Sequence, residues 1–199
     1  MVFDIVLQSS KQDVAQSIDA ERPQSDREAM AVHQVDGVDE PHIALARMAR
    51  LASITALNQI LADTMMLRDL YKKHHWQTFG AAFFQLHELF DKHHAEQLVI
   101  IDATAERIQM LGGTAIAMAA DVAVTTTLAL PPMERELPLR QLARLSDAHE
   151  QILALARAAA RRAAELGDDG SNDLLVGEII RTNEKQAWVV RQQSGAISS

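Results

Sequence analysis

The sequence contains no cysteine and has few aromatic, glycine and proline residues. Its 199 residues include 8 Gly and 5 Pro, and aromatic side chains make up 4%. The absence of cysteine excludes disulfides, zinc fingers and catalysis by a thiol. All-β sandwiches and barrels need many turn residues and ring-filled strands, so this composition argues against them. Because 48% of the residues are apolar and Ala, Leu, Gln, Glu and Arg are frequent, the sequence predicts one all-α domain.

Long apolar runs are absent as well. A membrane-spanning helix needs about 20 consecutive apolar residues, and no stretch of the chain approaches that length. The opening segment, MVFDIVLQSSK, carries an acid where a secretory signal carries bases, and its apolar run is short. We therefore expect a protein without a membrane segment, located in the cytoplasm with or without association with the nucleoid.

Basic residues are outnumbered by acidic ones. The chain has 19 Lys and Arg against 27 Asp and Glu, a formal net charge of −8. Nucleic-acid binders usually have the opposite balance, whereas an acidic protein attracts cations. Residues 1–40 carry nine acids and three bases and show no sustained periodicity. We interpret them as a mobile acidic extension, with a short helix around residues 29–35, and residues 194–199 as a short tail.

Residues 41–193 show the apolar periodicity of long helices. In the first predicted helix, one stripe runs in steps of three and four residues from Ile54 to His75, and Gly80 is a plausible end. The second helix is expected over residues 81–111 and the third over 138–166. The fourth is expected over 173–193, after a turn at 167–172. The second helix ends at a pair of glycines, 112 and 113, which is typical of a helix C-terminus.

The connection between the second and third helices is longer than the others. Within residues 114–137, a short helix is expected over residues 115–124, before the break at Pro131 and Pro132. Four long amphipathic helices with this long connection predict a four-helix bundle of ferritin-like connectivity. Classical ferritins and di-iron oxygenases carry Glu-x-x-His pairs, and no Glu of this chain has His three residues later. The sequence therefore excludes a classical ferritin or a di-iron oxygenase.

Histidines and carboxylates cluster in the second predicted helix. His87 and Asp91 are four residues apart and share a helix face, and Asp102 and Glu106 repeat that spacing. Imidazole and carboxylate ligands suit iron or another borderline divalent metal. Eleven residues of helix separate Asp91 from Asp102, a rise of about 16 Å, so one ion cannot bind both pairs within one chain. Either two half-sites exist, or two antiparallel copies of the helix complete each other's site across a two-fold axis.

Several motifs resemble the Dps family, the miniferritins or DNA-binding proteins from starved cells. They are His75-Trp76, the run Leu86-His87-Glu88-Leu89-Phe90-Asp91, the run from Ile101-Asp102 through Glu106-Arg107-Ile108, and Leu111-Gly112-Gly113. The spacing His-x11-His-x3-Asp followed by Asp-x3-Glu is highly specific. The resemblance covers about residues 48–190 and leaves the acidic extension outside.

The resemblance implies a function and assigns residues to it. His75, His87 and Asp91 match one half of the family's ferroxidase site, and Asp102 and Glu106 match the half supplied by the two-fold-related subunit. Trp76 matches an aromatic residue beside the site that accepts an oxidising equivalent. The family forms a hollow dodecamer that oxidises Fe(II) with hydrogen peroxide or oxygen and stores the ferric mineral, protecting against oxidative damage. Iron is the expected metal, with zinc as an alternative ion for the same ligands.

Two other functions remain open at this point. The first is a metal-sequestering shell with little turnover, since its ligands would be the same. The second is a chromosome-compacting protein. DNA binding in the family uses a lysine-rich mobile tail, whereas residues 1–40 are acidic and residues 189–199 hold only Arg191. An acidic arm repels phosphate, so we expect no strong DNA binding near neutral pH.

Other polar residues have simpler interpretations beside functional ones. We expect exposed polar surface for His74, His93 and His94, with an accessory metal role as the alternative. His149 lies on the apolar stripe of the third helix and is expected to be a hydrogen-bonded core residue. Trp76 and Trp188 could both fill the core, although Trp76 also has its position beside the site.

Two further sets of charged residues are candidates for a structural or functional role. Asp168, Asp169 and Asp173 are expected to cap that helix, with an iron-attracting pore as the alternative. Arg107 is expected to pair with an acid near the subunit interface or to remain an ordinary surface arginine.

Overall fold

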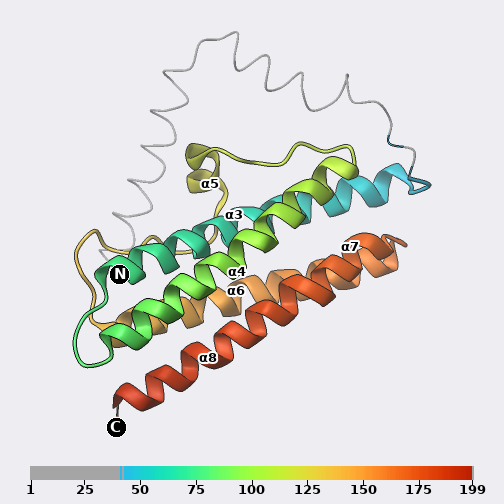
Figure 1. The fold of residues 1–199 in the computed structure, drawn as a ribbon. Helices are drawn as coiled ribbons and strands as arrows, with labels where there is room; N and C mark the ends of the chain where they lie inside the picture. Colours follow the sequence, from blue (N-terminus) through green and yellow to red (C-terminus); the bar gives the residue numbers. More distant parts are fainter. Residues whose placement is uncertain (1–40, 42, 199) are drawn as a thin grey trace, which may run out of the picture. The chain divides into compact units, whose positions relative to one another are not determined.

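The computed structural model describes residue 41 and residues 43–198 (Figure 1). The acidic extension and the short helix expected near residues 29–35 lie outside the described residues. The elements are α3 (Arg47–Gln77), α4 (Phe83–Met110), α5 (Ala119–Thr125), α6 (Pro138–Glu165), α7 (Asp169–Asp173), the π-helix η1 (Leu174–Ile180) and α8 (Arg181–Ser198). The described part of the chain contains no strand, which confirms the all-α prediction.

The long helices form a four-helix bundle in which η1 and α8 together make the fourth helix. Helix α3 packs against α4 and α6, and α6 packs against η1 and α8. Figure 1 shows that α4 and α6 run in the same direction, because the connection between them returns along the length of the bundle. Within that connection, α5 packs against α3. This is the ferritin-like connectivity that the sequence predicts.

The two glycines after α4 end that helix as expected. Gly112 has a φ of 81°, in the left-handed region that glycine adopts without strain. Its N–H donates to the carbonyl of Gln109 at 2.9 Å, and the N–H of Gly113 donates to that of Ile108 at 3.0 Å. These two bonds are those of a Schellman motif, which satisfies carbonyls that the helix leaves without partners. A Cβ on Gly113 would lie 2.7 Å from the Ile54 side chain, so this turn also packs closely on α3.

The core is built from the inward faces of the long helices. In α6, Leu142, Leu145, His149, Ile152 and Ala156 are all fully buried, as the periodicity predicts. The largest fully buried side chains of the bundle include Tyr71, Phe90, Leu57, Ile60, Leu61, Leu67, Leu86 and Ile108. No helix among the described residues is long and apolar enough to cross a bilayer.

The long connection is tied to α3 through one buried carboxylate. Asp63 is fully buried and accepts hydrogen bonds from the Thr126 hydroxyl at 2.8 Å and from the Thr127 N–H at 2.6 Å. The Thr127 hydroxyl and the Gln59 amide donate to its other oxygen at 3.0 and 3.1 Å. These threonines follow α5, which begins later than the short helix expected over residues 115–124 and ends one residue beyond it. Asp63 therefore fastens the middle of the connection to α3.

The fourth helix differs from the single α-helix expected over residues 173–193. It begins earlier, with α7, widens into the π-helix η1, and continues in α8 to Ser198. The Asn183 side-chain amide donates to the Ile179 carbonyl at 2.8 Å, at the end of the widened segment. A π-turn shifts the hydrogen-bond register by one residue, which periodicity in the sequence does not specify.

Candidate metal centre

His75 and His87 exchange hydrogen bonds across the short turn between α3 and α4. His75 Nδ1 lies 2.8 Å from the His87 carbonyl oxygen, and His87 Nδ1 lies 2.9 Å from the His75 carbonyl oxygen. The two rings stack with centroids 3.6 Å apart and planes 22° apart. A carbonyl oxygen only accepts, so each Nδ1 carries a proton, and in the neutral ring each Nε2 has the lone pair. Both imidazoles are thereby held as ligands with a free Nε2.

The helix end explains why this arrangement forms. His75 is in the last turn of α3, where carbonyl groups have no intrahelical donor. His87 comes one turn into α4 and supplies a donor to that carbonyl. The hydrogen bond therefore satisfies an otherwise orphaned group and fixes the His87 ring at the same time. Hydrogen bonds of this kind commonly orient histidines that bind metals.

Asp91 is held by a residue that the sequence analysis missed. It lies one turn after His87, and its Oδ1 accepts a hydrogen bond from Lys72 Nζ of α3 at 2.5 Å. The hydrogen bond from Lys72 lowers the pKa of Asp91, and the nearby His75 and His94 act in the same direction. Lys72 precedes His75 by three residues, so the two side chains share one face of α3. That spacing in the sequence would have indicated that Lys72 lies near the candidate ligands. The centre thus contains two imidazoles, one carboxylate and one ammonium group.

Asp102 and Glu106 lie farther along α4, and both are exposed. The helix is continuous from Asp91 to Glu106, so the rise of about 16 Å between the two carboxylate groups applies. Among the described residues of one chain, no three His, Asp or Glu side chains are close enough to hold an ion together. The donors therefore form two incomplete groups on the surface of one helix.

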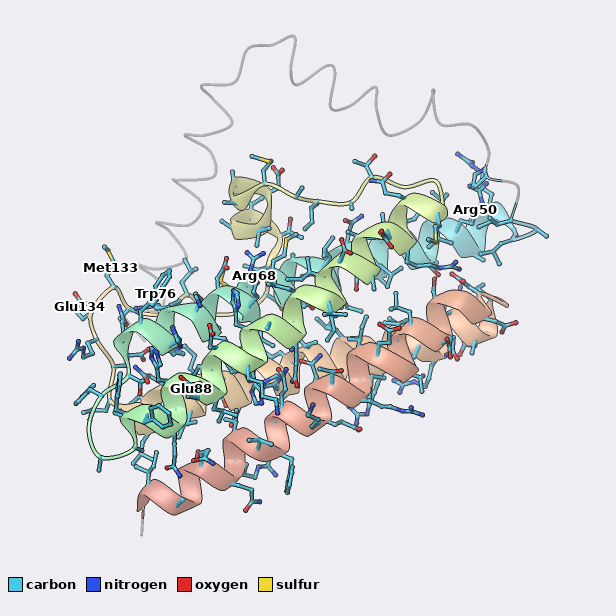
Figure 2. The ribbon with its side chains drawn as sticks, viewed as in Figure 1. Arg50, Arg68, Trp76, Glu88, Met133 and Glu134 are labelled. Atoms are coloured by element: carbon cyan, nitrogen blue, oxygen red, sulfur yellow. The ribbon has the colours of Figure 1, made fainter. Side chains whose placement is uncertain are left out.

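The two tryptophans do not fill the core of the chain. Trp76 is 70% exposed and Trp188 is 63% exposed, so the core interpretation is wrong for both. Trp76 directly follows His75 and lies at the same end of the bundle as Glu88 of α4 (Figure 2). Its place beside the candidate centre follows from its adjacency to His75, and its role there stays a prediction.

His74 and His93 are buried, so the expectation that they are exposed is wrong. His74 is 0% exposed and His93 is 1% exposed. His74 follows Leu67 and Leu70 on the buried face of α3, and His93 continues a stripe through Leu86 and Phe90 on α4. That three-and-four spacing was visible in the sequence, but the polar identity of histidine obscured it. His94 is partly exposed.

Burial determines the charge of these histidines. Desolvation lowers the pKa of His74 to about 4, and neither of its ring nitrogens has a hydrogen-bond partner. Desolvation also lowers the pKa of His93 and of His149 to about 4. His149 is fully buried and hydrogen-bonded to Tyr71 and Asn183, as expected for a core histidine. All three are neutral at pH 7.

The acidic turn before the fourth helix is partly structural. Asp168 is the N-cap of α7, accepts from the Ser171 N–H at 3.1 Å and is 1% exposed. It also pairs with Arg107 of the same chain at 2.5 Å and accepts from the Ser53 hydroxyl at 2.5 Å. Asp168 is therefore a capping residue, as expected, whereas its burial is incompatible with a pore-lining role in this chain. Asp169 and Asp173 are exposed.

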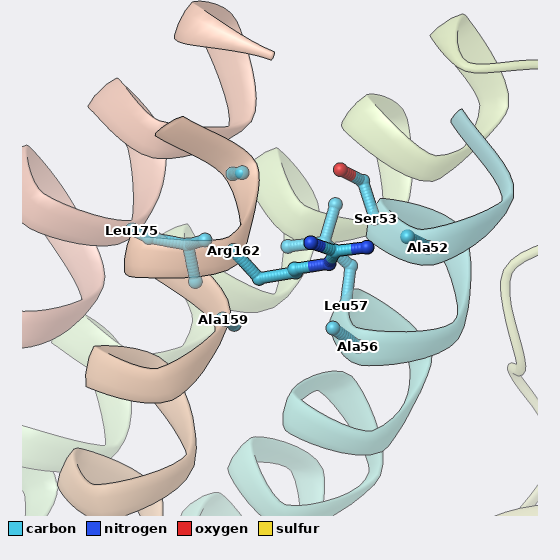
Figure 3. A pocket seen from close by; sticks show the side chains of 8 residues that line it. Ala52, Ser53, Ala56, Leu57, Ala159, Arg162 and Leu175 are labelled. Atoms are coloured by element: carbon cyan, nitrogen blue, oxygen red, sulfur yellow. The ribbon is translucent and has the colours of Figure 1, made fainter. Parts of the chain in front are cut away.

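A small hollow between α3, α6 and η1 is too small for an organic substrate. Figure 3 shows its lining, in which Ala52, Ala56 and Ala159 surround the Arg162 side chain. Its volume is about 10 Å³, room for about one water molecule. This hollow therefore has no room for the donors of the candidate centre, which lie on α3 and α4.

Comparison with known proteins identifies similar chains. A model of the ferritin-like domain matches residues 54–198. The structure of DpsC from Streptomyces coelicolor is 51% identical, covers 78% of this chain and 91% of its own, and superposes with a TM-score of 0.77. An uncharacterized protein of Kitasatospora aureofaciens is 46% identical over 74% of this chain and 98% of its own. The DNA protection during starvation protein of Porphyromonas gingivalis is 30% identical over 79% of this chain and 93% of its own.

Proposed function

This chain belongs to the Dps family of ferritin-like proteins, and on that premise we propose that it is a ferroxidase. Its substrates are Fe(II) and hydrogen peroxide, with oxygen as the slower alternative oxidant. The reaction takes place at a dinuclear site shared by two subunits, and the ferric product is stored inside a hollow assembly of twelve. The protein thereby removes both reactants that generate hydroxyl radical.

The observation that carries the proposal is the reciprocal hydrogen bonding of His75 and His87. It leaves two Nε2 lone pairs on one surface, one helical turn from the Asp91 carboxylate. Imidazole nitrogen and carboxylate oxygen together suit Fe(II), and the chain has no thiolate that would favour softer metals.

The second half of the site comes from another subunit in this proposal. Asp102 and Glu106 are exposed and about 16 Å along α4 from Asp91. If two copies of α4 run antiparallel across a two-fold axis, each copy presents its carboxylate pair to the histidines of the other. Such an interface contains two identical sites. The exposure of both groups in a single chain supports this arrangement.

The electron count explains why two irons react together. Two Fe(II) ions reduce one hydrogen peroxide to two hydroxide ions and become two Fe(III). Because both electrons arrive at one peroxide, the O–O bond breaks without release of hydroxyl radical. The residues of this chain bind and orient the iron, and Lys72 must release Asp91 when the dication arrives. The family resemblance assigns Trp76, beside His75, to accept an oxidising equivalent.

Charge supports a role in collecting cations more than a role in coating DNA. A net charge of −8 per chain becomes large in a closed assembly and raises the local concentration of Fe(II). Residues 189–199 hold only Arg191, and residues 1–40 are acidic, so neither tail neutralises phosphates. The P. gingivalis relative is named for DNA protection. In this chain we propose that protection comes from iron and peroxide removal, and zinc would act as a competing ion.

Stopped-flow absorbance tests the proposal directly. Two Fe(II) per subunit are added anaerobically, peroxide or oxygen follows, and ferric formation is recorded. The site variant is His87→Ala with Asp91→Ala, and the matched control is Glu88→Ala with Lys92→Ala, an exposed pair of the same spacing on the same helix. Fast oxidation lost only in the site variant is expected. Slow oxidation that is equal in all three proteins would instead indicate a sequestering shell.

A further inference from the structure

The bundle core contains a polar cluster that is separate from the proposed iron ligands. It consists of Tyr71 of α3, His93 of α4, His149 of α6 and Asn183 of α8, each at most 1% exposed. Tyr71 is the only tyrosine in the sequence. The cluster therefore brings the phenol to the middle of the bundle and surrounds it with groups from the other three helices.

The hydrogen bonds of the cluster determine where its protons lie. The Asn183 Nδ2 group donates to the Ile179 carbonyl at 2.8 Å, so Asn183 Oδ1 is the acceptor that faces His149 Nδ1 at 2.8 Å. His149 Nδ1 accordingly carries a proton, and its Nε2 has a lone pair. That nitrogen lies 2.6 Å from the Tyr71 hydroxyl oxygen and accepts the phenolic proton. The same oxygen accepts from His93 Nδ1 at 3.0 Å.

The environment keeps the phenol protonated until an electron leaves. Burial raises the pKa of Tyr71 well above its usual value of 10, so the proton does not leave at neutral pH by simple ionisation. Burial lowers the pKa of His149 to about 4, which keeps Nε2 unprotonated. An oxidised phenol is a very strong acid, so an adjacent base is what makes its one-electron oxidation accessible.

We propose that Tyr71 is a redox-active tyrosine that donates one electron to the iron centre while its proton passes to His149. The proposal rests on the proposed ferroxidase function. Tyr71 lies four residues before His75 on α3, a rise of about 6 Å on the same side of the helix. The Phe90 ring, which precedes Asp91, lies 6.1 Å from the Tyr71 ring. The backbone that holds the phenol is thus one helical turn from His75.

The electron is used when peroxide meets a centre that holds a single Fe(II). Hydrogen peroxide takes one electron from Fe(II) and one from Tyr71, and its O–O bond breaks to give two hydroxide ions. The products are Fe(III), a neutral tyrosyl radical and the His149 imidazolium. A later Fe(II) returns the electron to Tyr71, and His149 returns the proton. The sum is again two Fe(II) oxidised per peroxide, and no hydroxyl radical is released.

Rapid freeze-quench electron paramagnetic resonance on the full-length assembly tests the proposal. One Fe(II) per subunit is loaded anaerobically and mixed with peroxide. A tyrosyl signal is expected in the wild type and is assignable at once, because the chain has one tyrosine. Tyr71→Phe is expected to lose the signal and to release several-fold more spin-trapped hydroxyl radical. The Trp188→Phe variant, altered at an exposed site on α8, is expected to keep the signal.

His149→Gln separates a redox role from a structural one. Glutamine can still accept a hydrogen bond from Tyr71 but is not a base, so the radical yield is expected to fall roughly tenfold or more. Size-exclusion chromatography and circular dichroism establish that each variant folds and assembles. An unchanged radical yield in His149→Gln, or unchanged hydroxyl radical release in Tyr71→Phe, would overturn the proposal.

Two further measurements distinguish this proposal from the ferroxidase function. With two Fe(II) per subunit, Tyr71→Phe is expected to form ferric iron at the wild-type rate, because the extra electron is then not needed. If the wild type oxidises no iron, the ferroxidase function fails. In iron-free protein, a flash-generated ruthenium(III) oxidant should still produce the Tyr71 radical in a His149-dependent manner. Absence of that radical, or ferric formation from one Fe(II) per subunit without any tyrosyl signal, refutes the role of Tyr71.

Discussion

Lys72 and Asp91 form a direct ion pair, with 2.5 Å between the ammonium nitrogen and carboxylate Oδ1. The pair joins α3 to α4 one turn from the imidazoles of His75 and His87. In the metal-free chain a monovalent cation therefore holds the carboxylate that we propose for Fe(II). The ammonium group keeps Asp91 ionised and in place, but it must give way when the metal binds.

Replacing Lys72 by methionine should change iron binding in two opposite ways. At neutral pH the competing ammonium group is gone, so Fe(II) should bind several-fold more tightly. Lys72 lowers the pKa of Asp91, so without it that pKa rises toward its usual value, and protons compete with iron at higher pH than in the wild type. Anaerobic calorimetry with Fe(II) between pH 4 and pH 7 measures both effects. Lys73→Met, which removes a bond to Gln77, is the control. Identical pH profiles would contradict the prediction.

Subunit mixing tests whether the site is shared. Assemblies of His87→Ala, Asp91→Ala chains and assemblies of Asp102→Asn, Glu106→Gln chains should each be inactive. In a mixed two-fold pair, one site carries all the changes and the other carries none. Random co-assembly of equal amounts should therefore restore about a quarter of the wild-type sites. Mass spectrometry confirms mixing, and mixed assemblies without recovered ferric formation would refute a shared site.

Buried histidines should make the protein less stable in acid. Burial lowers the pKa of His149 from 6.5 to about 4, so between these values the unfolded chain binds a proton that the folded chain does not. Stability should therefore fall as the pH is lowered from about 6.5 to 4, by roughly 3 kcal/mol for His149 alone. Denaturant unfolding across this range measures the slope. His149→Gln should flatten it, and Glu150→Gln, an exposed neighbour, should not.

Removing the buried carboxylate at position 63 should loosen the long connection. Asp63→Ala leaves the Thr127 N–H and two threonine hydroxyls without their acceptor, at a cost of about 2–4 kcal/mol in unfolding free energy. Hydrogen exchange at Thr126 and Thr127 should accelerate. Asp69→Asn, an exposed change on the same helix, is the control. Unchanged exchange in Asp63→Ala would show that other contacts hold the connection.

Much of the architecture was predictable because helix periodicity is a local property. The stripe on α6 and the helix end at Gly112 were visible in the sequence, and the structure confirms them. The stripe expected on α3 is buried from Leu57 to Tyr71 except at Arg68, and it is only half-buried at Ile54 and His75. The fourth helix was less predictable, since the π-turn of η1 depends on how that helix fits against α6. The buried positions of His74 and His93 were misjudged because a polar residue on an apolar stripe was interpreted from its chemistry alone.

By itself, the sequence determined the fold class, the spacing of the proposed ligands and the impossibility of one ion bridging Asp91 and Asp102 within one helix. These follow from composition and from the fixed rise of an α-helix. Only the tertiary structure decided which ring nitrogens of His75 and His87 make hydrogen bonds. It also decided that Lys72 forms an ion pair with Asp91 and that Tyr71 forms a hydrogen bond with His149. Those contacts join side chains from different helices. Which sides of two helices contact each other depends on the packing between them, and the sequence pattern of one helix does not specify it.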